Sequence, residues 1–383
     1  MKLILCVDTG TTPRHSVTAI HSDPSATCSA GTLKHLPYRS SIEKSTTEGS
    51  LAPLSVNNPK ITKAVIAVHP AGSDPDSIFR AIRNGGGVNS STTLIVAPQF
   101  LPRTTGVDAM VLQWPENVDT HPTKGWVQGD VSVKFNVVRV STFDVMDKLI
   151  RTIIDLNSDL EEIVVVGFSR GANFTNRYSI ATRVEEEYSD NVGRKVYFRY
   201  AMQAPGSYLY FSDWRVHEED RNACLGFNHY RYGTDLNGTD AEGYGRMINA
   251  HYIRNLPKAG ISFIDNVKKK KRFFLVGDAD NFNGGNDPCG ELLQGDGRVH
   301  RMQQYVSHLQ VMNAHTDADS HPTITSCVVS DTDSETILDH TTLVLRQNAM
   351  LNFLKLDSRA TSTDWQDFVD HNNNGHCNEA MTF

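Results

Sequence analysis

The chain has 383 residues, of which 39% are hydrophobic and 21% charged, and its formal net charge is −7. This length can bury a sizeable core, and this composition is typical of a soluble globular protein. The negative balance gives no electrostatic argument for binding nucleic acid or an anionic membrane. No apolar run reaches the roughly 20 residues that a membrane helix needs, so we expect no membrane span.

The first part of the chain, residues 1–60, is rich in Ser, Thr and Pro and is expected to form leading strands and loops. Within it, the apolar run 3–7 is too short for the core of a signal peptide. We interpret this run as a first strand or as the remnant of a trimmed leader.

From residue 61 onward, short apolar or β-branched runs alternate with amphipathic stretches. This alternation predicts a mostly parallel sheet flanked by crossover helices. Ser141 and Asp144 have the spacing of a helix start and precede apolar residues at helical intervals. A final helix is expected near 340–356, ahead of a polar tail at 357–383. The clearest strands are expected at residues 64–68, 93–97, 163–166, 197–201, 273–276 and 323–329.

Two further segments are relevant to the domain organisation of the chain. Residues 205–266 carry many aromatic residues and glycines without a clear period, and we expect an insertion over the carboxyl edge of the sheet. The basic run 268–272 directly precedes an apolar strand, so we interpret it as a solvated strand entrance rather than a polyanion site. No internal repeat or long linker occurs, and residues 1–383 are expected to form a single domain.

The segment Gly167-Phe168-Ser169-Arg170-Gly171 follows an apolar strand and precedes a helix-compatible stretch. A Gly-x-Ser-x-Gly pattern in this setting is typical of a nucleophilic serine on a strained turn, where small flanking residues avoid clashes. The hydroxyl would stand at a helix N-terminus, whose dipole favours developing negative charge. A plain turn with an incidental serine is the alternative. We predict that Ser169 is the nucleophile.

An oxyanion hole needs backbone N–H groups directed at the reacting oxygen. The first donor would be Arg170, and the second should come from the loop after an earlier strand. Pro70 has no N–H, so Ala71 is the predicted donor, with Gly72 behind it. His69 precedes the nucleophile in the chain, and we interpret it as a packing residue.

The acid and the base should follow the nucleophile in that order. A strand at 273–276 runs into Gly277, Asp278 and Asp280. This segment resembles the acid loop of many α/β-hydrolases, which points to Asp280, with Asp278 as the alternative. His340 follows the last strand and is the predicted base. Four earlier histidines are interpreted as surface or packing residues: His300, His308, His315 and His321.

Further motifs extend beyond the serine turn: Ala97-Pro98-Gln99-Phe100, Trp126-x-x-Gly129-x-x-Ser132, Ser141-x-Phe143, Asn176-Arg177-Tyr178, Pro205-Gly206-Ser207-Tyr208-Leu209-Tyr210, and Cys224 leading to Asn228 and Tyr232-Gly233. In these motifs, the sequence from about Ile61 to Leu356 resembles a group of largely uncharacterised α/β-hydrolases from fungi and bacteria. The resemblance implies the α/β-hydrolase fold, a Ser-acid-His triad and hydrolysis of esters or related acyl compounds. The chain departs from that group twice. His69-Pro70 replaces a His-Gly, which bears on the oxyanion geometry, and Asp339-His340 replaces a Gly-His, which bears on the base.

No metal and no cofactor are expected. The six cysteines lack Cys-x-x-Cys spacing, which argues against a zinc site. Neither the acidic segment 278–287 nor the tail segment 370–381 completes a twelve-residue calcium loop. Of the 15 possible disulfide pairings of six cysteines, Cys289–Cys327 is the first choice, because each residue lies beside or within adjacent predicted strands. Sequons at Asn89, Asn173 and Asn237 favour secretion over a cytoplasmic location, with no stronger signal for either.

The function predicted from these features is hydrolysis of a carboxylic ester, in a small molecule or a polymer, through an acyl-enzyme. Trp126 and Tyr208 are predicted to contact the substrate, with lid packing as the alternative. Two other functions stay open: an acyltransferase or peptidase with the same triad, and a non-catalytic binding protein on this scaffold. The altered oxyanion loop motivates the last of these.

Overall fold

The computed structural model describes residues 2–8, 32–37, 60–84, 88–89, 91–103, 111–115, 125–133, 140–189, 195–224, 226–236, 251–258, 260, 262–280, 289–312, 324–329, 354 and 377–378. Within these ranges, no helix combines the length and the apolar character needed to cross a membrane.

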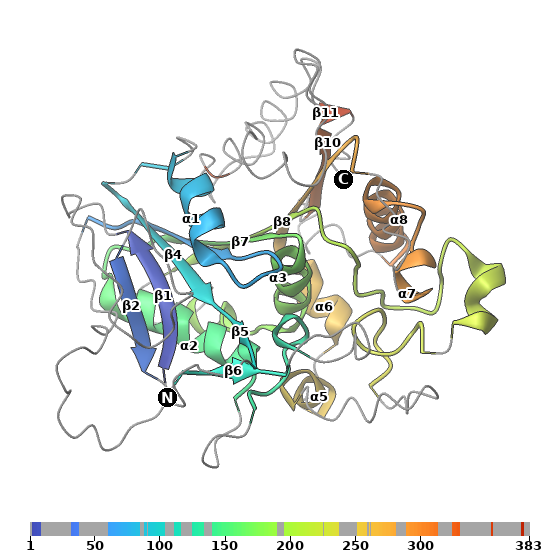
Figure 1. Ribbon diagram of the computed structural model, residues 1–383, viewed down its shortest axis with the longest axis horizontal. Coiled ribbons are helices and arrows are strands. Elements are labelled where there is room, and N and C mark those ends of the chain that lie inside the picture. The colour runs from blue at the N-terminus through green and yellow to red at the C-terminus, as the bar shows by residue number, and fades with distance from the viewer. Residues whose placement is uncertain are drawn as a thin grey trace.

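A nine-stranded sheet organises the described residues (Figure 1). Its strands lie side by side in the order β11-β10-β9-β8-β7-β3-β4-β1-β2. The six from β10 to β4 run parallel, whereas β1 is antiparallel to both β4 and β2, and β11 is antiparallel to β10. These nine strands are β1 Lys2–Asp8, β2 Thr32–Pro37, β3 Lys63–Val68, β4 Thr93–Gln99, β7 Glu162–Phe168, β8 Tyr197–Gln203, β9 Lys271–Gly277, β10 Ile324–Val329 and β11 Cys377–Asn378. A separate parallel pair consists of β5 Leu101–Pro102 and β6 Gln113–Trp114.

All six strands predicted after residue 60 are confirmed, the last of them as Ile324–Val329. The run at 3–7 forms β1, as one of its two interpretations proposed. The central strands β4 and β7 are buried along their whole length, which explains their continuous apolar runs. The predicted mostly parallel sheet flanked by helices is therefore correct.

Helices cover both faces of the sheet. Ala64, Ile66 and Val68 of β3 belong to one apolar core with residues of α2 and α3, while Val65 and Ala67 belong to a second core with residues of α1. Figure 1 accordingly shows α1 on the opposite side of the sheet from α2 and α3. The helices are α1 Pro75–Asn84, α2 Thr142–Leu156, α3 Arg170–Ala181, α4 Glu186–Ser189, α5 His251–Lys258, α6 Phe263–Lys268, α7 Cys289–Leu292 and α8 Arg298–Val311, with 3-10 turns η1 Trp126–Gln128 and η2 Glu218–Ala223.

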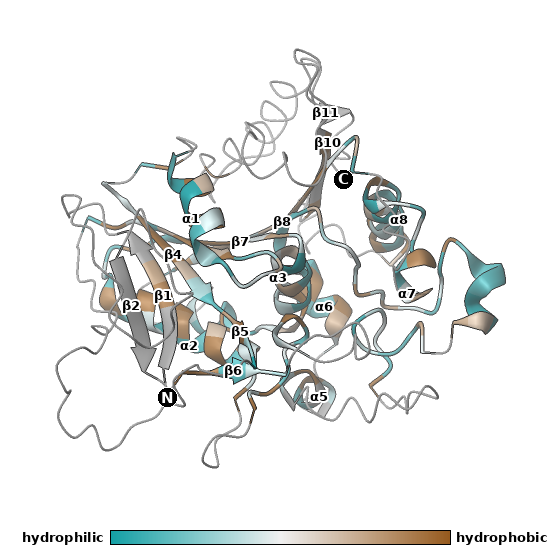
Figure 2. Ribbon diagram, viewed as in Figure 1, coloured by the Kyte–Doolittle hydropathy of each residue, from teal (hydrophilic) through white to brown (hydrophobic). Residues whose placement is uncertain are grey.

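The predicted helix start at Ser141 is confirmed. The Ser141 hydroxyl accepts a hydrogen bond from the Phe143 N–H at 3.1 Å, so it satisfies one of the unpaired donors of the first turn of α2. Figure 2 shows apolar residues on α2, in contrast to the hydrophilic η2, the yellow-green turn at the right of Figure 1. None of the residues of η2 is buried.

The basic run 268–272 is not solvated throughout, so that interpretation was wrong for two of its residues. Lys270 and Arg272 are buried. The Lys270 ammonium lies 2.9 Å from a carboxylate oxygen of Glu185 and donates to the Thr182 carbonyl oxygen at 3.1 Å. The run therefore anchors the start of β9 to the end of α3.

The disulfide prediction was also wrong. Cys289 is bonded to Cys224, with their Cα atoms 5.6 Å apart. Cys327 lies in the middle of β10 opposite Leu275, in the core that contains Val65, whereas Cys289 begins α7. Cys6 in β1 and Cys327 in β10, on well-separated strands of the sheet, each belong to a different disulfide. Sequence proximity to a strand did not reveal which side of the sheet each cysteine occupies.

Several predictions fall on other parts of the chain. The final helix at 340–356 lies outside the described residues, apart from Leu354, which is helical and buried. His340 and most of the polar tail lie outside them too. Cys377 and Asn378 of the tail form β11, so that this part returns to the edge of the sheet.

Candidate active site

Ser169 connects β7 to α3 in a strained backbone conformation, with φ 53° and ψ −117°. A positive φ is uncommon for a residue with a side chain and is found at functional turns. Two backbone hydrogen bonds hold the turn: the Ser169 N–H donates to the Gln203 carbonyl at 2.9 Å, and the Asn173 N–H donates to the Ser169 carbonyl at 3.0 Å. The side chain is partly exposed, at the carboxyl end of β7.

The two glycines of the pentapeptide are required by close backbone contacts. A Cβ atom on Gly167 would lie 2.1 Å from the Gly171 carbonyl oxygen. One on Gly171 would lie 2.2 Å from the Val68 carbonyl oxygen and 2.6 Å from that of His69. Any larger residue would push the turn away from β3. The steric reason for the motif is therefore present in this chain.

The predicted oxyanion donors lie on segments that approach each other. Arg170 is the first residue of α3, so its N–H has no carbonyl one turn earlier in the helix to donate to. The end of β3 contacts Gly171, and the loop then turns through Gly72 and Ser73, at φ 87° and 58°. Ala71 lies in this turn and is exposed. The roles of Arg170 and Ala71 stay predictions.

His69, at the end of β3, is a buried packing residue. Its Nε2 accepts a hydrogen bond from the Phe100 N–H at 2.9 Å, so Nδ1 carries the proton and donates to the Pro70 carbonyl oxygen at 2.7 Å. Its ring packs on Trp126, with the ring centroids 4.6 Å apart. Burial lowers the pKa of His69 to about 4, so the imidazole is neutral near pH 7. Both nitrogens are occupied, which leaves none for catalysis.

The two candidate acids after β9 have different surroundings. Asp280 is 1% exposed, and its Oδ1 lies 2.7 Å from Nη1 of Arg298 in the first turn of α8. The guanidinium offsets the cost of burying a charged carboxylate. Asp278 is exposed. A buried, oriented carboxylate suits the fixed hydrogen bond that a catalytic acid makes, which favours Asp280 over Asp278.

The strand order and the serine turn together decide the fold. Six parallel strands follow the order β4-β3-β7-β8-β9-β10, and the turn with the strained serine stands directly after the central β7. The fold is that of the α/β-hydrolases. In this fold the acid follows a later strand, as Asp280 does here, and the histidine follows the acid in the chain.

No family model matches the chain, and no curated protein matches it in sequence. Among solved structures it is similar to poly(aspartic acid) hydrolase-1 from Sphingomonas sp. KT-1, at 13% identity and a TM-score of 0.46 over 77% of this chain and 88% of that one. It is also similar to LpqC, a poly(3-hydroxybutyrate) depolymerase from Bordetella parapertussis, at 15% identity and a TM-score of 0.44, over 78% and 84% of the two chains. It is similar to esterase B from Lactobacillus Rhamnosis (HN001) as well, at 13% identity and a TM-score of 0.37, over 84% of this chain and 80% of that one. The fold assignment depends on the strand order and the Ser169 turn of this chain and not on these similarities.

Each of the histidines whose side chains the structure describes has a partner of its own. Apart from His69, these are His217, His229, His300 and His308. His308 accepts a hydrogen bond from the Phe211 N–H, and the other three lie against Asp296 or Asp235. The predicted base, His340, lies outside the described residues. It stays a prediction based on its place after β10.

Sequence reasoning missed the contacts of Asn173, whose N–H donates to the Ser169 carbonyl. It lies one turn after Ser169 on α3, and its Oδ1 accepts hydrogen bonds from the N–H groups of Gly206 and Ser207, at 2.8 and 3.3 Å. The Gly206 carbonyl in turn accepts from Nη1 of Arg301 at 3.0 Å. The only signal in the sequence was its place one turn after Ser169, where it had been noted as part of a sequon. We call the segments 205–224, 226–236 and 289–301 the side wall, because these bonds fasten them beside α3.

Trp126 and Tyr208 are both buried. Trp126 is 4% exposed and stacks on Phe100, with centroids 5.5 Å apart. Tyr208 is fully buried and stacks on Tyr305 at 4.5 Å. This packing favours the alternative that the sequence allowed, a structural role, over direct contact with substrate.

Proposed function

We propose that the protein is a serine hydrolase that cleaves carboxylic esters through an acyl-enzyme on Ser169. The observation that carries this proposal is the strained serine turn between β7 and α3, with two glycines that tolerate no side chain. A fold stores such strain at functional sites, and a structural turn at this position would not need a positive φ at a serine.

The reaction divides into two acyl transfers. His340 takes the proton from the Ser169 hydroxyl, and the oxygen attacks the ester carbonyl carbon to form a tetrahedral oxyanion. The N–H groups of Arg170 and Ala71 stabilise that oxyanion. His340 then protonates the departing alcohol, and a water molecule activated by the same histidine releases the acid. Asp280 holds the imidazole in the tautomer that accepts the serine proton.

Labelling of the serine tests the nucleophile. A fluorophosphonate should modify the wild-type protein at Ser169. Ser169→Ala should abolish this labelling and lower kcat for ester hydrolysis by about 10⁴-fold or more. Ser158→Ala is the matched control, because Ser158 is exposed in a turn outside this site. Equal labelling of the Ser169→Ala variant would contradict the proposal.

The identity of the acid is tested by Asp280→Asn and Asp278→Asn. The first should lower kcat by about 10⁴-fold, as loss of an orienting carboxylate does, and the second should leave it within a few-fold. Because Asp280 is also paired with Arg298, the Tm of each variant is measured beside kcat. A folded Asp280→Asn variant with normal kcat would move the assignment to another residue.

The bond that is cleaved is tested with a panel of esters of graded acyl and alcohol length beside matched amides. We expect turnover of esters and not of amides. Turnover of amides alone would indicate a peptidase, and acyl transfer to an added alcohol in preference to water would indicate an acyltransferase. A protein with no turnover and no labelling would be a binding protein on this scaffold.

A further inference from the structure

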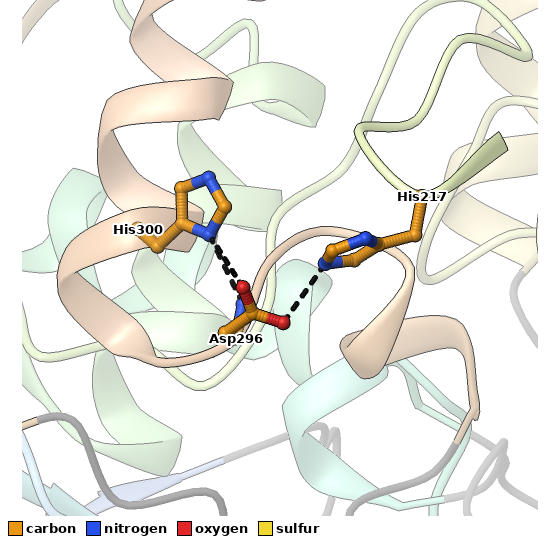
Figure 3. A group of neighbouring side chains, drawn as sticks. All are labelled: His217, Asp296 and His300. Atoms are coloured by element: carbon orange, nitrogen blue, oxygen red, sulfur yellow. Dashed lines mark hydrogen bonds and ion pairs between the residues drawn. The ribbon is translucent and has the colours of Figure 1, made fainter.

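We propose that His217, Asp296 and His300 form a zinc site that fastens the loop after β8 to the start of α8 (Figure 3). Cysteine spacing and calcium-loop patterns in a sequence do not reveal ligands that come from two distant segments. The proposal is independent of the serine chemistry.

The three side chains converge on one point. Nε2 of His217 lies 2.9 Å from one carboxylate oxygen of Asp296, and Nδ1 of His300 lies 3.4 Å from the other. All three donor atoms lie within 4.8 Å of one another. Zinc holds nitrogen and oxygen ligands at about 2.0–2.2 Å in a tetrahedron, which separates them by about 3.3 Å. Small side-chain rotations would therefore complete the coordination.

The tautomer of His300 suits a metal. The Asp296 N–H donates to its Nδ1 at 3.2 Å, so Nδ1 carries the lone pair and Nε2 the proton; zinc would take up this lone pair in place of the hydrogen bond. Nε2 lies 3.0 Å from the side-chain amide of Gln304, whose oxygen accepts this proton when the amide is turned accordingly. A histidine ligand with its distal N–H held by a neighbouring acceptor is the usual arrangement in zinc sites.

His217 approaches Asp296 without a hydrogen bond. Its Nε2 is buried from solvent and makes no hydrogen bond to any described residue, although it lies within ion-pair distance of the carboxylate. A metal ion would give this buried nitrogen the partner that it lacks among the described residues. The other ring nitrogen, Nδ1, lies 4.0 Å from a carboxylate oxygen of Glu219, where a distal partner would stand.

The site is accessible and has room for a fourth ligand. The Asp296 side chain is 73% exposed, so an ion can enter from solvent and a water molecule can occupy the remaining position. Two imidazoles and a carboxylate are among the ligands that zinc prefers. The simpler alternative is a proton on one imidazole, which would make the cluster an ordinary ion pair.

A metal here would support the wall beside the candidate acid. The loop that carries His217 continues to Cys224, whose disulfide to Cys289 joins it to α7. Asp296 and His300 flank Arg298, the ion-pair partner of Asp280. Zinc would therefore fix the first turn of α8, and with it the position of Arg298.

The test uses the full-length protein, stripped with a chelator and titrated with ZnCl2 by calorimetry, with bound metal counted after desalting. Wild type should take up one zinc ion per chain and gain Tm. His300→Ala and Asp296→Asn should bind more than about 100-fold more weakly, because loss of a distal partner alone costs 10–100-fold. His229→Ala is the matched control: His229 lies 3.6 Å from one carboxylate, Asp235, and among the described residues it belongs to no such cluster.

Two results would overturn the proposal. Wild type that takes up no zinc would leave the cluster as an ion pair. Uptake that is equal in wild type and in Asp296→Asn would place the ion elsewhere on the surface. If His300→Ala does not fold, cobalt in place of zinc decides the matter: its visible absorption should report a His-carboxylate site in wild type and His229→Ala, and vanish in Asp296→Asn.

Discussion

The serine turn and the side wall meet at Asn173 but are held by different kinds of contact. The turn depends on backbone proximity, because Gly167, Gly171 and the end of β3 leave no space for a side chain. The side wall depends on buried arginines that donate to backbone carbonyls, as Arg177 does to Arg231 and Arg301 does to Gly295.

The most extensive of these contacts belongs to Arg215. Its guanidinium donates to the carbonyl oxygens of Ser212, Trp214, Phe227 and Tyr232, at 2.9, 2.6, 3.0 and 2.9 Å. Irregular segments bury carbonyls that no strand or helix satisfies, and one planar cation with five N–H groups can satisfy several. The serine turn is thus specified by close backbone contact, and the side wall by long-range hydrogen bonds from side chains.

The largest effect is expected from Gly171→Ala. Its Cβ would meet backbone atoms of β3 that cannot move without disturbing the sheet, so we expect loss of more than about 4 kcal/mol of unfolding free energy, or no folded protein. Urea denaturation measures this loss.

Gly206→Ala is its control in the side wall. There a Cβ would approach nothing nearer than a Glu291 carboxylate oxygen at 3.4 Å, so the change should cost less than about 1 kcal/mol. Equal costs at the two glycines would show that the turn is not specified by close backbone contact.

Arg215→Met tests whether hydrogen bonds from a buried arginine hold the side wall. The variant leaves buried carbonyls unsatisfied, and we expect a loss of about 3–5 kcal/mol. Arg221→Met is the control, since Arg221 lies at the exposed η2 and pairs with exposed carboxylates; its loss should stay below about 1 kcal/mol. A small effect at Arg215 would mean that apolar packing alone holds the side wall.

This division explains what the sequence could reveal. The strands, the Ser141 cap and the turn at Ser169 were predictable because strand pattern, cap and turn are each encoded within a few residues. The roles of Ser169 and Asp280 stay predictions. The pairing of Cys289 with Cys224, the burial of Trp126 and Tyr208, and the histidine cluster at Asp296 all join distant segments of irregular chain, where no periodicity indicates which residues meet.

The Cys224–Cys289 disulfide gives a smaller test of the side wall. It closes a loop of 65 residues, and replacing both cysteines by serine should cost about 2–4 kcal/mol, because the unfolded chain regains freedom. The loss is measured by urea denaturation under non-reducing conditions. In strong reductant the difference between wild type and the double variant should shrink, and a difference that persisted unchanged would point to packing of the thiols instead of the cross-link.

The smallest effect is expected in the pH dependence of the unfolding free energy, to which one buried histidine near each region contributes. His69 lies beside the serine turn and His308 packs on Tyr210 and Trp214 against the side wall; burial lowers the pKa of each to about 4. An unfolded histidine titrates near pH 6.5, so each contributes its full stability above that pH and loses it as the pH falls toward 4. For His69 the loss between pH 7 and pH 5 should be about 2 kcal/mol. Unfolding free energies of His69→Gln and His308→Gln at several pH values should each fall less steeply than wild type, and a slope unchanged in His69→Gln would show that the imidazole is not held neutral beside the turn.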